Sequence, residues 1–392
     1  MEGWVQLRIG DLFEVKAGGD LQESCYSPSQ TKHALWPIYA NSLENKGLYG
    51  YTSKPRFSGD AVTITGRGDI GHAEYRAEDF DAIVRLLVLL PKVDVDCRYI
   101  TYYINSLVHF PKESTGVPQL TAPKVKRIKI NLPQSKAEQT TIANILSKVD
   151  ETIASVQNSI ASAERLKKSL MQNLVTGKMK PDGTIRTPEE FYIDEKFGKV
   201  PIGWEVKRVD EVSERKTEVI DPTRTKEVFD YVGLEHIVSN EFTRCGKGVS
   251  NETVALKVIF EKGDLLYGKL RPYLNKVIIA DISGVGSTEL IVLRRNEFTK
   301  WIYLNFQLQR FLDYTKSMTA GTQHPRVSWK DIKHYMVCIP KRSKEMDYIT
   351  DKILSIEYNK KDQYLKIKKL ERLKKSLMQN FLTGKTKINI MI

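Results

Sequence analysis

The chain has 392 residues, a formal net charge of +13 and hydrophobic residues at 41% of its positions. This length allows two ordinary domains with connectors, each burying its own core. No run of about eighteen apolar residues occurs, and the start "MEGWVQLRIG" lacks the layout of a signal peptide, so we expect neither a membrane span nor export and place the chain in the cytoplasm. The positive charge favours a polyanionic partner such as nucleic acid.

The cysteines Cys25, Cys97, Cys245 and Cys338 are scattered along the chain without a Cys-x-x-Cys pair. The six histidines form no cluster with them at the spacing of metal ligands. The sequence therefore predicts neither a disulfide framework nor a zinc site, and we expect the cysteines to be buried small hydrophobic residues.

Residues 1–134 have the pattern of a globular domain of mixed helix and strand. It opens on Gly3-Trp4, contains the strand-like runs "AVTIT" (61–65) and "AIVRLLVLL" (82–90), and has a Gly-Asp turn at residues 59–60. One amphipathic helix, "RYITYYINSLVHF", is expected before a last strand that ends at Leu132-Pro133.

Residues 135–180 are predicted to form a long helix. Apolar residues recur there in alternating steps of three and four, a heptad pattern that is interrupted once after Ala163. The helix ends in the basic box "ERLKKSLMQNLVTGK" (164–178).

Residues 181–341 are predicted to hold a linker and a second domain on the same plan. It opens on Gly203-Trp204, has a Gly-Asp turn at 263–264, and contains the strand-like runs "VALKVIF" (254–260), "KVIIADI" (276–282) and "ELIVLRR" (289–295). Its single amphipathic helix is expected at "KWIYLNFQLQRFLDY" (300–314).

Residues 342–392 are predicted to form a second long helix and a C-terminal tail. The box returns there as "ERLKKSLMQNFLTGK" (371–385), displaced by 207 residues and altered at two positions. Helices of about 40 residues cannot bury an apolar stripe alone, so we expect the two to pack on each other; the alternative is two separate surface helices. The predicted pairing seam comprises Ile142, Leu146, Val149, Ile153, Leu166, Leu170, Ile349, Ile353, Leu370 and Leu377, and the same pattern includes Leu373.

This order of domain, helix, domain and helix, with nearly duplicated helices, resembles the specificity subunit of type I restriction-modification systems. The paired boxes carry the resemblance, supported by "GWEVKRVDEV" at 203–212. It implies an α+β fold in which each globular part is a target recognition domain for one half of a split, asymmetric site on double-stranded DNA. It also implies an antiparallel pair of spacer helices that docks two methyltransferase subunits and, through them, restriction and translocase subunits.

The resemblance further implies that this chain is not itself an enzyme. It carries no cofactor or metal, and the partner subunits use S-adenosylmethionine, ATP and magnesium. Two other readings stay open: a stand-alone magnesium-dependent nuclease built on Asp182, Glu214 and Lys216, and a coiled-coil scaffold that does not bind DNA. "GDLLYGKL" (263–270) looks like a phosphate-binding loop, but Leu270 stands where a hydroxyl is needed and Pro272 follows.

Candidate DNA-binding residues lie in two loops of each domain. Arginine suits phosphate and guanine, and glutamine suits adenine. "TGRGD" (65–69) and "GVPQLTAPK" (116–124) supply the first domain's set, and "YGKLRPY" (267–273) and "AGTQHPRVS" (320–328) supply the second's. The residues are Arg67, Gln119, Thr121 and Lys124 in the first domain, and Lys269, Arg271, Tyr273, Gln323, His324 and Arg326 in the second.

The basic boxes have three possible roles: a DNA-facing stripe, a solvated flank of the helix pair, or a partner contact. We favour the partner contact, because near-identity of two boxes suits two copies of one partner. The candidate docking residues are Arg165, Lys168, Arg372 and Lys375.

Overall fold

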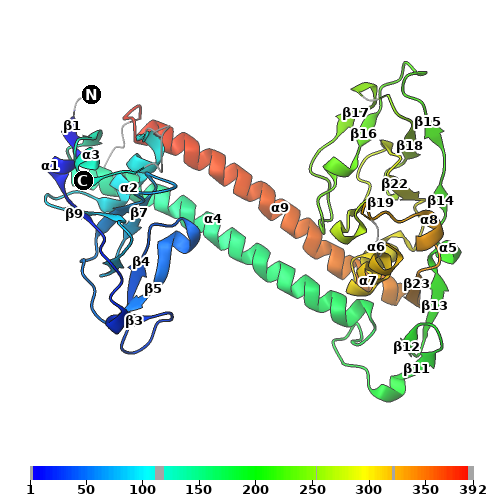
Figure 1. The fold of residues 1–392 in the computed structure, drawn as a ribbon. Helices are drawn as coiled ribbons and strands as arrows, with labels where there is room; N and C mark the ends of the chain where they lie inside the picture. Colours follow the sequence, from blue (N-terminus) through cyan, green and yellow to red (C-terminus); the bar gives the residue numbers. More distant parts are fainter. Residues whose placement is uncertain (1–2, 111–118, 253, 320–322, 387–392) are drawn as a thin grey trace. The chain divides into compact units, whose positions relative to one another are not determined.

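The computed structural model describes residues 3–110, 119–252, 254–319 and 323–386. The chain divides into two compact units, and both are discontinuous in sequence. Unit 1 comprises Met1–Val156 and Lys366–Ile392, and unit 2 comprises Gln157–Leu365. The units cut across the four predicted segments, because each gathers a globular part together with portions of both long helices, α4 (Lys136–Leu170) and α9 (Ser343–Phe381) (Figure 1).

Unit 1 contains two small sheets and an outer strand pair. Strands β1 (Trp4–Arg8) and β10 (Lys129–Pro133) pair antiparallel, with Trp4 opposite Pro133. One sheet has the order β2 (Phe13–Ala17), β9 (Leu87–Pro91), β6 (Ala61–Ile64), β7 (Ala73–Arg76), and the other β3 (Tyr26–Ser27), β5 (Leu48–Thr52), β4 (Trp36–Tyr39), β8 (Asp81–Ala82). The helices of this globular part are α1 (Ile9–Leu12), α2 (Cys97–Leu107) and α3 (Ala122–Lys126).

Unit 2 repeats this frame. Strands β13 (Trp204–Arg208) and β23 (Met336–Pro340) pair with Trp204 opposite Pro340. One sheet has the order β14 (Arg215–Lys216), β22 (Leu290–Leu293), β19 (Leu265–Gly268), β20 (Val277–Ile279), matching β2-β9-β6-β7. The other has the order β15 (Val219–Ile220), β18 (Lys257–Phe260), β21 (Gly284–Ser287), β16 (Asp230–Val232), β17 (Gly248–Val249). The helices of its globular part are α5 (Val209–Val212), α6 (Thr299–Phe306), α7 (Gln309–Met318) and α8 (Trp329–Ile332).

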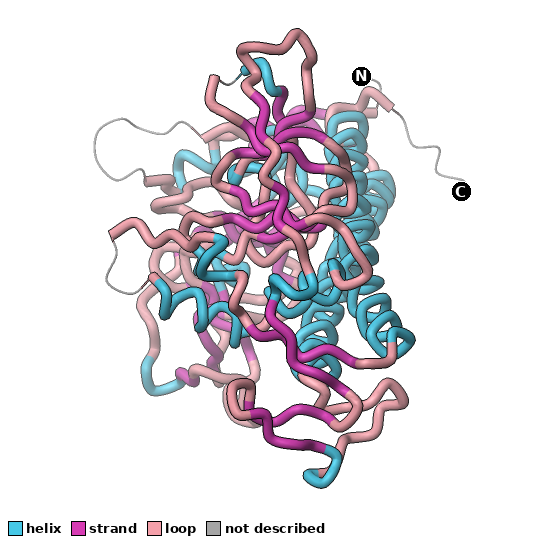
Figure 2. The backbone as a smooth tube through the Cα atoms, turned by 90° about the vertical axis from the view of Figure 1, so that its right-hand side faces the viewer, coloured by secondary structure: helices cyan, strands magenta, loops and turns pink. Residues whose placement is uncertain are grey.

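Figure 2 shows the strands and the helices of the chain in separate colours, with long loops joining the short strands. In both units the second sheet contains one parallel strand pair: β4 with β8 at the edge in unit 1, and β21 with β16 inside the sheet in unit 2. The shared strand order agrees with the 207-residue repeat in the sequence. The two units therefore have a common frame and differ in the strands added at its edges.

Three predictions from the sequence were wrong in detail: one strand, one helix and the burial of the cysteines. The run 82–90 is divided between β8 and β9, because Val84 and Arg85 take positive φ angles of 53° and 59°, which no strand continues through. The predicted helix 300–314 is divided into α6 and α7 at Gln307 and Leu308. Of the cysteines, Cys97 and Cys338 are buried, whereas Cys25 is half-buried and Cys245 is exposed.

The segment predicted as a linker is held firmly in unit 2. It contains the hairpin β11 (Phe191–Asp194) and β12 (Gly198–Pro201). The Arg186 guanidinium donates to the Gly177 carbonyl and to the Glu345 carboxylate, both at 2.8 Å. Within the described residues, no helix is both long enough and apolar enough to cross a membrane.

Candidate nucleic-acid interface

The two candidate loops of unit 1 meet in the structure. Arg67 and Gln119 form an isolated antiparallel β-bridge, and the Leu120 amide donates to the Gly66 carbonyl at 2.8 Å. Both Arg67 and Gln119 are exposed. Two stretches about fifty residues apart thus present an arginine and a glutamine from one small surface, which is what base-edge recognition needs.

The turn that carries Arg67 is fixed by hydrogen bonds. The Asn41 side chain accepts from the Gly66 amide at 2.6 Å and donates to the Arg67 carbonyl at 2.5 Å. The Thr65 hydroxyl donates to the Asp69 carbonyl at 2.5 Å, and Gly68 takes a φ of +73°, which glycine adopts without strain. Sequence reasoning missed Asn41, because no motif connects it to a turn that lies 26 residues later.

The remaining unit 1 candidates lie at the start of α3. Thr121 is the N-cap residue of α3 and is half-buried, and Lys124 is exposed on its surface. The predicted loop 116–124 is only partly visible, since residues 116–118 lie outside the described residues.

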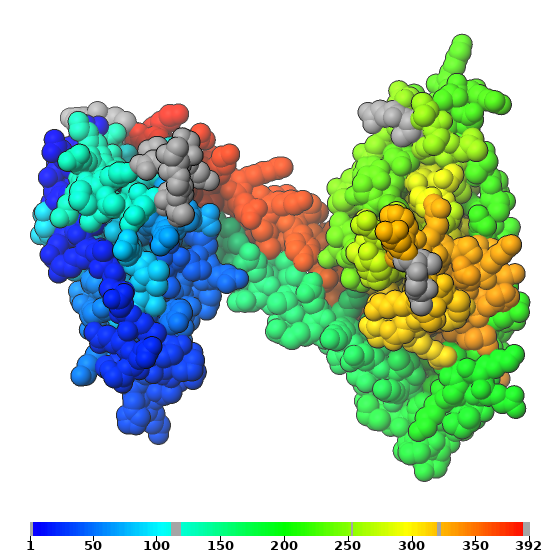
Figure 3. All heavy atoms as spheres, in the orientation of Figure 1, coloured from blue at the N-terminus to red at the C-terminus, as the bar shows by residue number. Residues whose placement is uncertain are grey.

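The two candidate loops of unit 2 meet at the equivalent place. Leu270 and Arg326 form an isolated antiparallel bridge. The Arg271 amide donates to Pro325 at 2.8 Å, and the Val327 amide donates to the Lys269 carbonyl at 3.0 Å. As in unit 1, the first loop follows the third strand of the four-stranded sheet and the second precedes a short helix. Figure 3 shows the yellow and orange part of unit 2 on the drawn face, and residues 320–322 of the second loop lie outside the described residues.

The candidate DNA-binding residues of unit 2 differ in their exposure and in their contacts. Arg271, Gln323, His324 and Arg326 are exposed, and Tyr273 retains 48% of its accessible surface. Lys269 is half-buried, and its ammonium donates to the Thr288 carbonyl. Arg271 has a left-handed φ of +51°, a conformation that is uncommon outside glycine.

Cationic side chains outnumber acidic ones on this surface of unit 2. A hollow of about 400 Å³ is lined by Arg215, Lys269 and Arg326, with Glu289 as the acid among them. Burial lowers the pKa of Lys269; Glu289 opposes this, and the neighbouring Arg215 and Arg326 act in the same direction as burial. An anion bound here would reduce the electrostatic repulsion among Lys269, Arg215 and Arg326.

The long helices pair antiparallel within each unit. In unit 2 the Lys360 ammonium lies 3.2 Å from the Glu164 carboxylate, and Lys167 contacts Glu357. A step from Glu164 to Lys167 on α4 thus corresponds to a step from Lys360 back to Glu357 on α9, so the helices run antiparallel. In unit 1 the Lys374 ammonium lies 2.7 Å from Asp150, which is the equivalent pair in the 207-residue repeat.

Most predicted seam residues are at least half-buried, but Leu166 is not. Leu166 is 52% exposed and its counterpart Leu373 is 48% exposed, so neither belongs to the seam. The heptad break after Ala163 turns these positions outward, because an extra three-residue step rotates the apolar stripe. Ile142 and Leu146 pack in the core of unit 1, and Leu170, Ile349 and Ile353 pack in the core of unit 2, whereas Val149, Ile153, Leu370 and Leu377 are half-buried.

Comparisons with known proteins agree on one family. A family model for the type I restriction modification DNA specificity domain matches residues 1–165. The EcoDI type I specificity subunit of Escherichia coli is 20% identical over 86% of this chain and 78% of that protein. The MjaVIII type I specificity subunit of Methanocaldococcus jannaschii is 22% identical over 75% of this chain and 71% of that protein. Residues 1–165 thus match the type I specificity domain, and most of the chain is similar to type I specificity subunits.

The fold is similar to that of a solved specificity subunit. The crystal structure of a type I restriction-modification S subunit from M. genitalium matches with a TM-score of 0.67, over 96% of each chain at 17% identity. At that identity the likeness concerns the fold.

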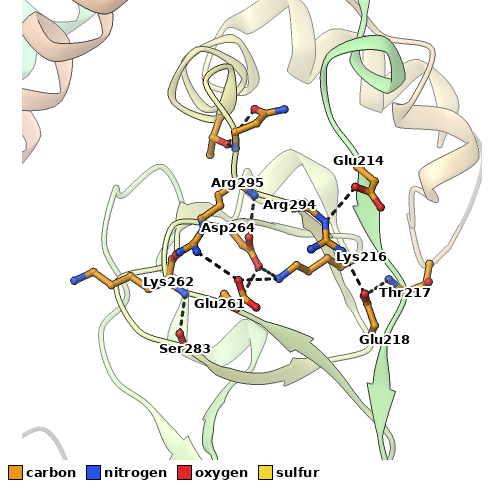
Figure 4. A network of polar contacts seen from close by, with 12 residues as sticks. Glu214, Lys216, Thr217, Glu218, Glu261, Lys262, Asp264, Ser283, Arg294 and Arg295 are labelled. Atoms are coloured by element: carbon orange, nitrogen blue, oxygen red, sulfur yellow. Dashed lines mark hydrogen bonds and ion pairs between the residues drawn. The ribbon is translucent and has the colours of Figure 1, made fainter.

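The alternative nuclease reading is not supported. Lys216 is 5% exposed, and its ammonium lies 2.8 Å from the fully buried carboxylate of Asp264 (Figure 4). Glu214 instead pairs with Arg294 at 3.1 Å. Asp182 accepts the Thr184 hydroxyl at 2.7 Å in a separate turn, and this hydrogen bond lowers the pKa of the carboxyl. Within the described residues, no group of three or more His, Cys, Asp and Glu side chains has the geometry of a metal site.

The basic boxes present one face to solvent. The candidate docking residues Arg165, Lys168, Arg372 and Lys375 are all exposed. The two boxes differ at Leu174/Phe381 and Val175/Leu382, and these are positions that pack into the cores of the two units. The exposed positions of the two boxes are identical. A helix with only a structural role would instead be free to vary at its exposed positions.

Proposed function

We propose that each unit reads one half of a split site on double-stranded DNA. The observation that carries the proposal is the bridge between two candidate loops in each unit, Arg67 with Gln119 and Leu270 with Arg326. Each bridge gathers cationic and amide side chains on the same frame. Specific recognition combines such contacts to base edges with Lys and Arg contacts to phosphate, and the net charge of +13 favours both.

The paired long helices set the spacing between the two half-sites. Antiparallel ion pairs in each unit and apolar residues along both helices support a coiled pair. Two similar readers suit a site whose half-sites lie on opposite DNA strands.

The exposed faces of the two boxes dock two methyltransferase subunits. Identical exposed residues at two equivalent places suit two copies of one partner, whereas two different DNA half-sites would not require identity. The exposed Leu166 and Leu373 add an apolar contact beside the arginines and lysines of each face. Restriction subunits then join through the methyltransferases, and S-adenosylmethionine, ATP and magnesium act in those partners.

The proposal that each unit reads its own half-site is tested by substituting the candidate residues of one unit at a time. Arg67→Ala with Gln119→Ala should relax discrimination in one half-site, and Arg271→Ala with Gln323→Ala should relax it in the other. A base contact is worth roughly 1 to 3 kcal/mol of discrimination. Sequencing of modified sites after expression with the methyltransferase measures both halves at once.

The controls for that experiment are the reciprocal half-sites. Each double variant should leave the half-site of the other unit unchanged. A variant that altered preference throughout both halves would contradict independent reading, and failure of the unmodified complex to bind any duplex would favour a scaffold.

Docking is tested by reversing the charge of one box. Arg165→Glu with Lys168→Glu should reduce the number of bound methyltransferase subunits from two to one, because these exposed cations lose their attraction for the partner. Arg372→Glu with Lys375→Glu should do the same, and the combined variant should bind none. Native mass spectrometry counts the subunits, and full occupancy in the combined variant would exclude these faces as the docking sites.

A further inference from the structure

Glu289 holds the guanidinium of Arg326 by one edge. The Nε–H of Arg326 donates to Oε2 of Glu289 at 3.0 Å, and Nη2 donates to Oε1. The Arg326 side chain is 57% exposed and that of Glu289 is 28% exposed. The carboxylate thus lies on the inner side of the pair and the arginine lies on the outer side.

Among the residues that the structure describes, Glu289 is the hydrogen-bond partner of this guanidinium, and the other edge is open. A guanidinium has five N–H donors in a planar fork, and Glu289 uses one on Nε and one on Nη2. The remaining donors, on Nη1 and Nη2, form a second parallel pair. Two parallel donors match guanine, whose major-groove edge presents the acceptors O6 and N7 side by side. Adenine presents a donor beside its N7 and would repel the same fork.

The backbone around the pair is fixed by three segments joined together. The Lys269 amide donates to the Glu289 carbonyl at 2.9 Å, and the Lys269 carbonyl accepts from the Val327 amide at 3.0 Å. Arg326 itself bridges Leu270. Both members of the pair are therefore attached to the same loop, so the orientation of the guanidinium is set before any DNA binds.

The surroundings favour an acceptor-rich ligand. Glu289 shares the 400 Å³ hollow with the cations Arg215, Lys269 and Arg326, and it is already bonded to Arg326. In unit 1 the corresponding surface has Arg67, and no carboxylate pairs with that arginine within the described residues. Among the described residues of these two surfaces, the carboxylate-held arginine is thus found in unit 2.

We propose that Arg326 reads a guanine in the half-site bound by unit 2, and that Glu289 is the residue that positions its guanidinium. The proposal rests on the proposed DNA-reading function. Glu289 acts through Arg326 and does not contact the base.

The test is selection from a randomised duplex library by the complex of the full-length chain with its methyltransferase. The unmodified chain should select a guanine that Arg326→Ala no longer selects, with a loss of roughly 10-fold to 100-fold in preference at that position and no change elsewhere. Arg326→Lys should fail in the same way, because an ammonium cannot donate through a planar fork. Glu289→Gln should weaken the preference at the same position, which a merely structural role would not do.

A chemical probe separates base contact from folding. Replacing the selected guanine with 7-deazaguanine removes the N7 acceptor, so it should weaken binding by the unmodified chain and leave binding by Arg326→Ala unchanged. Arg224→Ala is the matched control, since Arg224 is 86% exposed in the same unit and pairs with Asp221 on its own loop. That control should keep the full preference.

The outcomes distinguish this inference from the function on which it rests. If the unmodified complex selects no sequence, the proposed function fails and the guanine contact fails with it. If it selects a split site but Arg326→Ala keeps every guanine preference, DNA reading stands and the role of Arg326 is refuted.

Discussion

Glu357→Gln is expected to lower the free energy of unfolding of unit 2 by about 3 to 5 kcal/mol, as breaking a buried ion pair does. Glu357 is 3% exposed and lies against two ammonium groups, those of Lys167 and Lys360, the latter at 3.6 Å. The substitution keeps the shape of the side chain and removes its charge. Lys360 then keeps only the half-exposed carboxylate of Glu164, and Lys167 loses the carboxylate that it contacts.

The repeat supplies a matched control. Asp150 pairs with Lys374 at the equivalent place in unit 1, where their side chains are 39% and 27% exposed. Asp150→Asn should therefore cost less than about 1 kcal/mol, because water screens that pair. Urea denaturation followed by circular dichroism measures both variants. Equal losses in the two variants would mean that burial does not decide the strength of these pairs.

Leu170→Asp is expected to destabilise unit 2 by several kcal/mol and to release the box from its core. Leu170 is 9% exposed and packs with Met171 and Leu174 in that core. A carboxylate there loses its hydration without gaining a partner, and the lost leucine adds a cost of about 2 to 5 kcal/mol. Thermal unfolding measures the loss.

Leu166→Asp is the control on the same helix. Leu166 is 52% exposed, so the same substitution should change stability by about 0.5 kcal/mol or less. It should nevertheless weaken docking of the methyltransferase, because Leu166 lies on the proposed docking face. If Leu166→Asp destabilised the chain as much as Leu170→Asp, the exposed face would have a structural role and the docking proposal would lose its support.

Much of the local structure could be predicted because it depends on short-range patterns. Heptad spacing predicted the two long helices, and the strand-like runs at 61–65 and 289–295 correspond to β6 and β22. The predictions that were wrong involve backbone geometry that residue type does not reveal. Positive φ angles at Val84 and Arg85 break one strand, and the exposed Leu166 follows from a change of helix phase that a fixed heptad count ignores.

The candidate loops could be located from sequence, but the arrangement of their side chains could not. Glycine, arginine and glutamine in turns indicated where DNA contacts belong. Asn41 holds the turn of Arg67 from 26 residues away, and Glu289 orients Arg326 from 37 residues away. Neither residue has a local signal, because a hydrogen bond between distant segments depends on how the chain returns.

The sequence by itself determined the duplicated plan, the two long helices and the resemblance to type I specificity subunits, since repeats and periodicity are written in consecutive residues. Only the tertiary structure decided that each box packs in the unit formed by the other half of the repeat. Residues 164–170 join the core and the ion pairs of unit 2, and residues 374–382 join those of unit 1. Lys167 meets Glu357 across 190 residues of sequence. Such a contact forms because α4 and α9 lie antiparallel beside each other within unit 2, and no local pattern in the sequence records that pairing.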